Sequence, residues 1–273
     1  MKFETVKVDV EHAVKAQLML YIQERYQEMY GDRKRPMIII CPGGGYEHVS
    51  VREGEPIAFQ FLAAGCHAAV LQYDVVGDGM EHPLPLMELA WAVSYIREQA
   101  DAYGIDGNKI VVAGFSAGGH LAASLGCFWD KPWLSEKTGM DKKRYQPNGL
   151  ILAYPVITSG EHAHKASFER LMGSKASPEL EALLSLENQV TDQVPPVFLW
   201  HTVEDASVPL ENSMLFVKAL RQAGVSFEYH VFPHGRHGLA LATKETTMPD
   251  QSMVDPQCEQ WILLCKNWMQ YNL

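Results

Sequence analysis

The stretch VVAGFSAGGHLAA, from Val111 to Ala123, decides the fold of this chain. Its first residues are β-branched and apolar, which suits a buried strand, whereas His120–Ser124 contains good helix formers. Ser116 lies at the junction, and Gly114 and Gly118 stand two residues away on either side. Because a tight turn leaves no room for neighbouring Cβ atoms, this spacing predicts a strand, a sharp corner at the serine and then a helix.

The five residues from Gly114 to Gly118 satisfy the pattern G-x-S-x-G. In a nucleophile elbow the serine hydroxyl stands clear of the sheet edge, and the next backbone N–H points to where a negative oxygen would form. The same pattern also occurs in tight turns that carry no chemistry. The strand before it and the helix after it favour a nucleophile at Ser116.

Apolar runs alternate with helical patterns on both sides of this corner, which is typical of an α/β fold with a mostly parallel sheet and helices on both faces. The apolar runs predict strands at 17–24, 67–75, 150–156, 195–203 and 225–233, a strand at the start of 36–45, which ends in glycines, and a further strand leading into the quoted stretch. Residues 55–65, 84–104, 211–224 and 258–272 have helical spacing. We find no repeat or linker, and therefore predict one domain over 1–273, with a helical lid insertion at 158–192.

Composition excludes several classes of protein. A chain of 273 residues with 47% hydrophobic residues can bury a sizeable core, and a net charge of -10 argues against a nucleic-acid partner. The five cysteines show no C-x-x-C spacing, and His162 and His164 are two residues apart, so we expect no disulfide framework, no metal and no cofactor. The chain lacks a signal-peptide pattern and a run of about 18 apolar residues, which predicts a cytoplasmic location and no membrane partner.

A run of glycines follows the strand that ends near Ile40, in the sequence from Pro42 to Tyr46. Backbone N–H groups approach a ligand closely only where side chains are absent, and an early glycine loop supplies the oxyanion donors in sheets of this kind. A flexible turn is one alternative. A phosphate cradle is another, but no Gly-Lys-Ser/Thr follows. Tyr46 and Glu47 could contact substrate at the mouth of the site, or could make polar contacts between this loop and the next helix.

A serine nucleophile needs a base and an acid, which are expected later in the chain in the order acid, then histidine. The loop after the strand 195–203 contains Glu204 and Asp205, and we favour Asp205 as the acid, with Glu204 as the alternative. A later loop contains His234 and His237. We favour His237 as the base because a glycine follows it and permits close approach, with His234 as the alternative. Each of these residues could also be an ordinary surface residue.

Four stretches carry a resemblance to a known family. They lie at 41–58, 109–123, 195–213 and 227–241, and they follow the family's order across nearly the whole chain. The chain resembles serine esterases of the α/β-hydrolase superfamily, close to bacterial proteins described as acetyl esterase, xylan esterase or sugar hydrolase. It departs from the larger lipase-like group at Pro42, where that group usually has histidine, and in lacking its long N-terminal cap. The resemblance therefore implies a pocket that is either more open or roofed by 158–192.

The resemblance implies a role for each matching residue and an activity for the chain. Ser116 resembles the nucleophile, Asp205 the acid and His237 the base, and the oxyanion donors correspond to the backbone N–H groups of Gly44, Gly45 and Ala117. The implied reaction is hydrolysis of short-chain carboxylic esters, above all acetyl esters of carbohydrates, through an acyl-enzyme. A peptidase or amidase with the same triad is one alternative, and a non-catalytic binding protein with this fold is another.

Two pairs of tryptophans allow predictions about binding. Trp129 and Trp133 follow the helix after the serine, and Trp129 could stack on a sugar ring, with core packing as the alternative. Trp261 and Trp268 are seven residues apart on the last helix, which predicts either a core position or a stripe at a homodimer interface.

Overall fold

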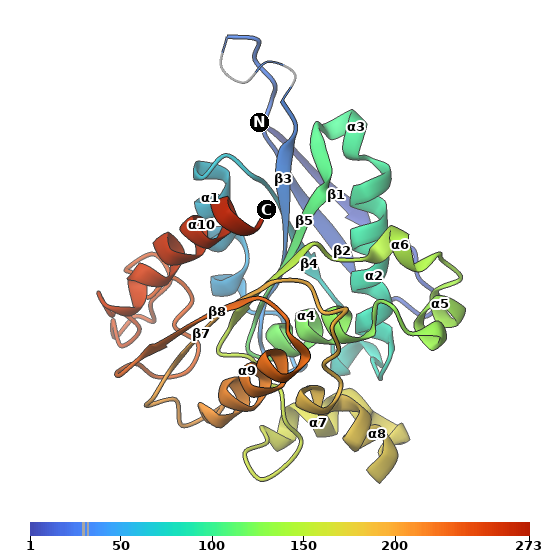
Figure 1. The fold of residues 1–273 in the computed structure, drawn as a ribbon, viewed down its shortest axis with the longest axis vertical. Helices are drawn as coiled ribbons and strands as arrows, with labels where there is room; N and C mark the ends of the chain where they lie inside the picture. The colour runs from blue at the N-terminus through green and yellow to red at the C-terminus, as the bar shows by residue number, and fades with distance from the viewer. Residues whose placement is uncertain (29–30, 32) are drawn as a thin grey trace.

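The computed structural model describes residues 1–28, 31 and 33–273. In these ranges eight strands form one sheet in the order β1-β2-β4-β3-β5-β6-β7-β8 (Figure 1). The strands are β1 (Lys2–Lys7), β2 (Gln17–Ile22), β3 (Arg35–Cys41), β4 (His67–Gln72), β5 (Ile105–Phe115), β6 (Gly149–Ala153), β7 (Val197–Thr202) and β8 (Phe227–Phe232).

The sheet is mostly parallel, as the sequence predicts. From β4 through β3, β5, β6 and β7 to β8 every neighbouring pair is parallel. Only β2 runs against its neighbours, since it pairs antiparallel with both β1 and β4. β1 is not among the predicted strands, because it is an edge strand whose residues alternate between exposed and half-buried and offer no apolar run.

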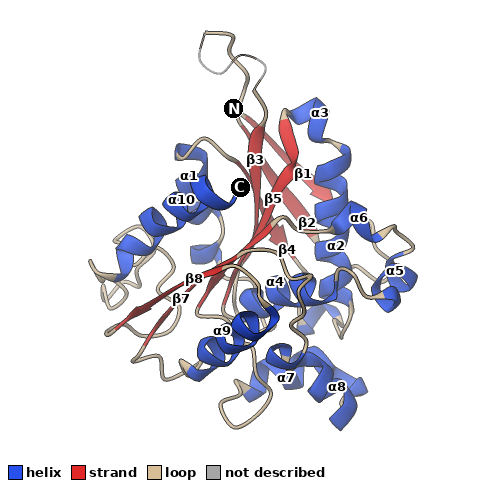
Figure 2. Cartoon of the chain, viewed as in Figure 1, coloured by secondary structure: helices blue, strands red, loops and turns tan. Residues whose placement is uncertain are grey.

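Helices cover both faces of this sheet (Figure 2). The described residues form α1 (Glu55–Ala63), α2 (Leu84–Glu98), α3 (Ala100–Tyr103), α4 (Ala117–Phe128), α5 (Pro132–Thr138), α6 (Lys142–Tyr145), α7 (Lys165–Met172), α8 (Pro178–Leu184), α9 (Glu211–Ala223) and α10 (Trp261–Asn272). The predicted helix 84–104 is divided, because the chain leaves helical geometry at Gln99 before α3. α7 and α8 lie in the predicted helical segment between β6 and β7.

Two clusters of buried side chains hold the layers together. α1 and α10 pack on one face of the sheet through residues that include Phe61, Trp261 and Trp268. α2, α4 and α9 pack on the other face through residues that include Leu121 and Phe216. Both tryptophans of α10 are almost completely buried, so they belong to the core of this chain rather than to a surface stripe.

None of the helices in the described ranges combines the length and the apolar character that crossing a bilayer requires.

A buried carboxyl group lies on α2, beneath the end of β4. Glu88 is fully buried, and its Oε2 accepts a hydrogen bond of 3.0 Å from the backbone N–H of Asp74. Its Oε1 has no hydrogen-bond partner among the described residues. Burial, and then the negative charge of Asp74, raises the pKa of Glu88 to about 9. Glu88 is therefore protonated in the folded protein at neutral pH.

Replacing this group with an amide should stabilise the protein at alkaline pH. A glutamate in the unfolded chain ionises near 4.5, whereas folded Glu88 keeps its proton until about 9. The contribution of Glu88 to the free energy of unfolding is complete below its pKa in the unfolded chain. It is lost as the pH rises from that pKa to the pKa in the folded protein. Glu88→Gln should therefore raise the free energy of unfolding by on the order of 2–4 kcal/mol at pH 8, with little change at pH 4.

Chemical denaturation at pH 4, 6 and 8 measures this effect. Glu136→Gln, at an exposed glutamate, is the control, and its effect should not depend on pH. A change in stability for Glu88→Gln that is the same at all three pH values would contradict the expectation.

Candidate active site

Ser116 lies at a sharp corner between β5 and α4. Its backbone has φ 54° and ψ −118°, a region that residues with side chains rarely adopt. A Cβ at Gly114 would overlap the carbonyl oxygen of Gly118, and a Cβ at Gly118 would overlap that of Cys41. The glycines are therefore needed for α4 to pass this close to the ends of β5 and β3, as the pattern around the serine predicts.

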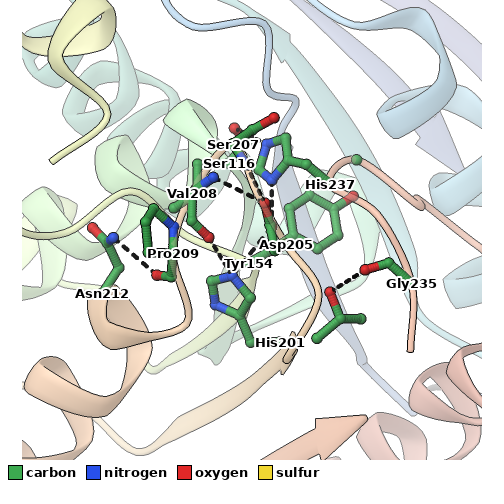
Figure 3. Close-up of polar contacts among 12 residues, drawn as sticks. Ser116, Tyr154, His201, Asp205, Ser207, Val208, Pro209, Asn212, Gly235 and His237 are labelled. Atoms are coloured by element: carbon green, nitrogen blue, oxygen red, sulfur yellow. Dashed lines mark hydrogen bonds and ion pairs between the residues drawn. The ribbon is translucent and has the colours of Figure 1, made fainter. Parts of the chain in front are cut away.

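The corner brings Ser116 into contact with a histidine 121 residues further along the chain. His237, in the loop after β8, places its Nε2 2.7 Å from Oγ of Ser116 and its Nδ1 2.6 Å from Oδ2 of Asp205 (Figure 3). A charged carboxylate only accepts hydrogen bonds, so Nδ1 donates to Asp205 and Nε2 is left to accept from the serine hydroxyl. These contacts suit a proton transfer from Ser116 to His237.

Asp205 is buried in the loop after β7, where hydrogen bonds surround both of its oxygens. Oδ1 accepts from the backbone N–H groups of Ser207 (3.0 Å) and Val208 (2.9 Å). Oδ2 accepts from His237 and, at 3.2 Å, from His201. Burial alone would raise the pKa of Asp205, but the hydrogen bonds from His201 and His237 outweigh it and hold the pKa well below its ordinary value. The group therefore carries a negative charge at neutral pH.

The two alternative residues contact each other instead of Ser116. Nδ1 of His234 lies 2.9 Å from Oε1 of Glu204, and both side chains are more than half exposed. Oε2 of Glu204 also accepts from the backbone N–H of Gly235. Of the two acids and two histidines, the structure therefore brings Asp205 and His237 to the serine.

The glycine loop after β3 lies beside Ser116. Gly44 and Gly45 have φ values of 124° and 63°, and a Cβ at Gly44 would overlap the carbonyl oxygen of His48. Among the described residues, the backbone N–H groups of Gly44, Gly45 and Ala117 have no hydrogen-bond partner. They are thus available to donate to an oxygen bound next to Ser116.

Two charged residues after this loop connect it to the loop of His237. Oε2 of Glu53 accepts from the backbone N–H of Gly43 (2.8 Å), and its Oε1 accepts from the hydroxyl of Tyr154 (2.7 Å). The ring of Tyr154 stands edge-on to His237, with centroids 5.1 Å apart. Arg52 donates to the carbonyl oxygen of Gly238, at 2.9 Å. The sequence offers little signal for this connection, because the residues next to Arg52 and Glu53 do not indicate which of the charged side chains after the glycine loop is buried.

Ser116 and His237 open into a cavity of about 410 Å³. Glycines and polar or charged side chains form most of its lining, and among the described residues no phenylalanine, tyrosine, tryptophan or large aliphatic side chain lines it. The lining residues are Gly44, Gly45, Glu47, His48, Ser50, Arg52, Glu53, Ser116, His164, Ala166, Arg170, Ser207, His237 and Gly238. Such a wall suits a substrate that is small or rich in hydroxyl groups near the reacting bond.

The three predicted substrate contacts have different outcomes. Glu47 lines the cavity, where its carboxylate lies 2.7 Å from the guanidinium of Arg170. Tyr46 does not, because φ 59° turns its side chain into the core, where its hydroxyl lies 2.9 Å from Nδ1 of His120. Trp129 is also buried away from the cavity, and its indole N–H donates to a backbone carbonyl. The prediction of substrate contact is therefore corrected for these two residues.

The segment 158–192 supplies one side of the cavity. His164 and Arg170 line it, and Arg170 also donates to the carbonyl oxygen of Gly45, at 3.2 Å. Nδ1 of His164 lies 2.8 Å from the hydroxyl of Ser167. Sequence reasoning missed Arg170, because a helical pattern does not indicate which polar side chain faces a glycine loop 125 residues away in the chain.

Comparison with known proteins places the chain among esterases. Residues 24–220 match the BD-FAE protein family. The chain is 42% identical over 221 residues to Endo-1,4-beta-xylanase B of Butyrivibrio fibrisolvens. The aligned region covers 78% of this chain but only 34% of the length of that relative. The match thus spans about a third of the length of that relative.

Solved structures match over almost the whole chain. An acetyl ester-xyloside bifunctional hydrolase from Caldicellulosiruptor lactoaceticus is 38% identical with a TM-score of 0.82, covering 94% of this chain and 88% of the other. A carboxylesterase from Lactobacillus plantarum is 33% identical with a TM-score of 0.89, covering 99% and 98%. The fold is therefore that of the α/β-hydrolases, and these neighbours group the chain with carboxylesterase-type hydrolases.

Proposed function

Because the chain belongs to the BD-FAE family, we propose that it hydrolyses carboxylic esters with Ser116 as nucleophile, His237 as general base and Asp205 as the acid that orients His237. The observation that carries this proposal is the continuous hydrogen bonding from the Ser116 hydroxyl through the His237 ring to the Asp205 carboxylate. A serine hydroxyl is a weak nucleophile without such a base.

The reaction proceeds in two halves. Oγ of Ser116 attacks the ester carbonyl while Nε2 of His237 takes its proton, and the oxygen of the tetrahedral intermediate accepts from the N–H groups of Gly44, Gly45 and Ala117. Collapse of the tetrahedral intermediate breaks the ester bond, and His237 passes the proton to the leaving alcohol. Water then attacks the acyl-serine, with His237 again as base, and releases the carboxylic acid and free Ser116.

We propose short acyl groups, above all acetyl, on carbohydrates as the substrates. The described lining of the cavity offers no large aliphatic side chain and no phenylalanine, tyrosine or tryptophan to a long acyl chain, whereas its charged groups can bind hydroxyl groups. The names of the acetyl ester-xyloside hydrolase and of the xylanase point to the same class. We further propose that 1–273 is one domain in which 158–192 acts as a lid. The homodimer and the cytoplasmic location stay predictions.

A substrate comparison tests the proposed activity. The kcat/KM of the protein should fall by about tenfold or more from the 4-nitrophenyl ester of acetate to that of octanoate, because the longer chain finds no large aliphatic side chain in the described lining to pack against. Acetylated xylooligosaccharides should be deacetylated. A strong preference for an aminoacyl-anilide over 4-nitrophenyl acetate would instead identify an amidase.

A substitution at the cavity mouth tests the carbohydrate class separately. Glu47→Ala removes a charged hydrogen-bond acceptor for sugar hydroxyls, and should raise the KM for acetylated xylooligosaccharides about tenfold. The same variant should keep its kcat/KM for 4-nitrophenyl acetate within about twofold, since that alcohol has no hydroxyl to bind. Glu136→Ala, at an exposed glutamate outside the cavity, is the control. An equal loss on both substrates would argue against a sugar contact at Glu47.

A further inference from the structure

A second histidine contacts the carboxylate that orients His237. His201 is the fifth residue of β7 and is fully buried. Its Nε2 lies 3.2 Å from Oδ2 of Asp205 and 3.0 Å from the carbonyl oxygen of Val208, and its Nδ1 lies 2.7 Å from the hydroxyl of Ser213 on α9. Figure 3 shows His201 on the side of Asp205 away from His237.

The partners of His201 determine where its proton lies. Oδ2 of Asp205 and the carbonyl oxygen of Val208 only accept hydrogen bonds, so Nε2 must carry a hydrogen and donate. In the neutral ring, Nδ1 then accepts from the Ser213 hydroxyl. Ser213 is itself fully buried, so this second bond holds the ring against rotation.

We propose that His201 is a positioning residue that acts through Asp205: it orients the carboxylate and reduces the basicity of Oδ2 toward His237, and it thereby sets the pH at which His237 becomes a base. This inference rests on the proposed function of Ser116 and His237. In the arrangement seen here, one carboxylate oxygen is shared by two imidazole donors, one from β7 and one from the loop after β8.

The physical reason is competition for one oxygen. Each donor withdraws electron density from Oδ2, so a carboxylate with two donors stabilises an imidazolium less than a carboxylate with one. The hydrogen bond from His201 also contributes to the low pKa of Asp205, against the opposing effect of burial. Without His201, Oδ2 would interact more strongly with His237 and would stabilise its protonated form up to a higher pH.

Several other ionisable groups face His237. Those that line the cavity with it are Glu47, His48, Arg52, Glu53, His164 and Arg170. Tyr154, at the end of β6, stands against the His237 ring, and burial raises the pKa of its hydroxyl well above the ordinary value, so it stays neutral. His164 approaches from the segment 158–192, where burial, and then the charge of His237, lowers its pKa. Ser213 on α9 is uncharged. Among the described residues, no charged group other than Asp205 is hydrogen-bonded to His201, so we expect these groups to keep their places when His201 is replaced and a change in pH dependence to report on His201.

The pH dependence of kcat/KM for 4-nitrophenyl acetate tests the proposal. His201→Leu replaces the donor with an apolar side chain of similar size. The acid limb of the pH profile of this variant should move up by about 0.5–1 pH unit. Its kcat should be about tenfold lower, and its KM should stay within about twofold. His201→Gln is the matched control, because its side-chain amide can donate from nearly the same place, and its acid limb should stay at the wild-type pH. Ser213→Ala loosens the ring and should shift the limb in the same direction by less, which keeps the test available if His201→Leu does not fold.

A purely structural role gives a different result. If rates in the folded variants fall equally at all pH values and the acid limb does not move, the proposal is wrong. Titration of the His237 ring by NMR in the wild type and in His201→Leu measures the same shift without substrate. A protein that is inactive on esters but shows the shift would therefore contradict the proposed function and leave this inference intact.

Discussion

Ser116→Ala should lower kcat for 4-nitrophenyl acetate by about 10⁴-fold or more, and the variant should fold normally. The hydroxyl oxygen of Ser116 forms the acyl-enzyme. Among the described residues that line the cavity, no other side-chain hydroxyl is hydrogen-bonded to His237. Its loss leaves only the oxyanion donors and substrate binding. Steady-state kinetics on the purified variant measure the effect, with the far-ultraviolet circular dichroism and the melting temperature as checks on folding.

A second serine in the same cavity provides the control for this variant. Ser207 lines the cavity, and its contact with Asp205 is made by its backbone N–H. Ser207→Ala should therefore keep kcat within about threefold of the wild type. A fluorophosphonate probe should label the wild type and Ser207→Ala but not Ser116→Ala. If Ser116→Ala keeps a tenth or more of the activity, another residue is the nucleophile.

His237→Ala should produce a loss of similar size, about 10⁴-fold in kcat, because the serine then has no base to accept its proton. His234→Ala should change kcat by no more than about threefold, since the ring of His234 contacts Glu204 at the surface and not the serine. Kinetics of the two alanine variants, measured on the same substrate and at the same pH, test the choice between the histidines. If His234→Ala is the more damaging of the two, the assignment of the base is wrong.

The same comparison applies to the two acids. Asp205→Asn should be far more damaging than Glu204→Gln, because only Asp205 contacts Nδ1 of His237 and holds the ring in the tautomer that leaves Nε2 free to accept. A larger loss for Glu204→Gln would mean that the loop after β7 rearranges when substrate binds.

Local sequence patterns were sufficient for the elements and for the corner at the serine. The apolar runs of β3, β5, β6 and β7 are nearly continuous because both faces of these strands are covered, and such runs predict strands without any knowledge of their neighbours. Gly114 and Gly118 indicate the corner because the absence of a Cβ matters at the residue itself. The edge strand β1 escaped prediction, since its residues are exposed or only half-buried and form no apolar run.

By itself, then, the sequence determined the α/β architecture and reduced the candidate site to one serine, two acids and two histidines. Only the tertiary structure decided that His237 contacts both Ser116 and Asp205 while Glu204 and His234 bind each other, that Tyr46 and Trp129 belong to the core, and that Arg170 and His164 face the cavity. The physical reason is one of distance along the chain. Secondary structure follows from residues a few positions apart, whereas the direction of a loop side chain depends on contacts with segments that lie 30 to 121 residues away.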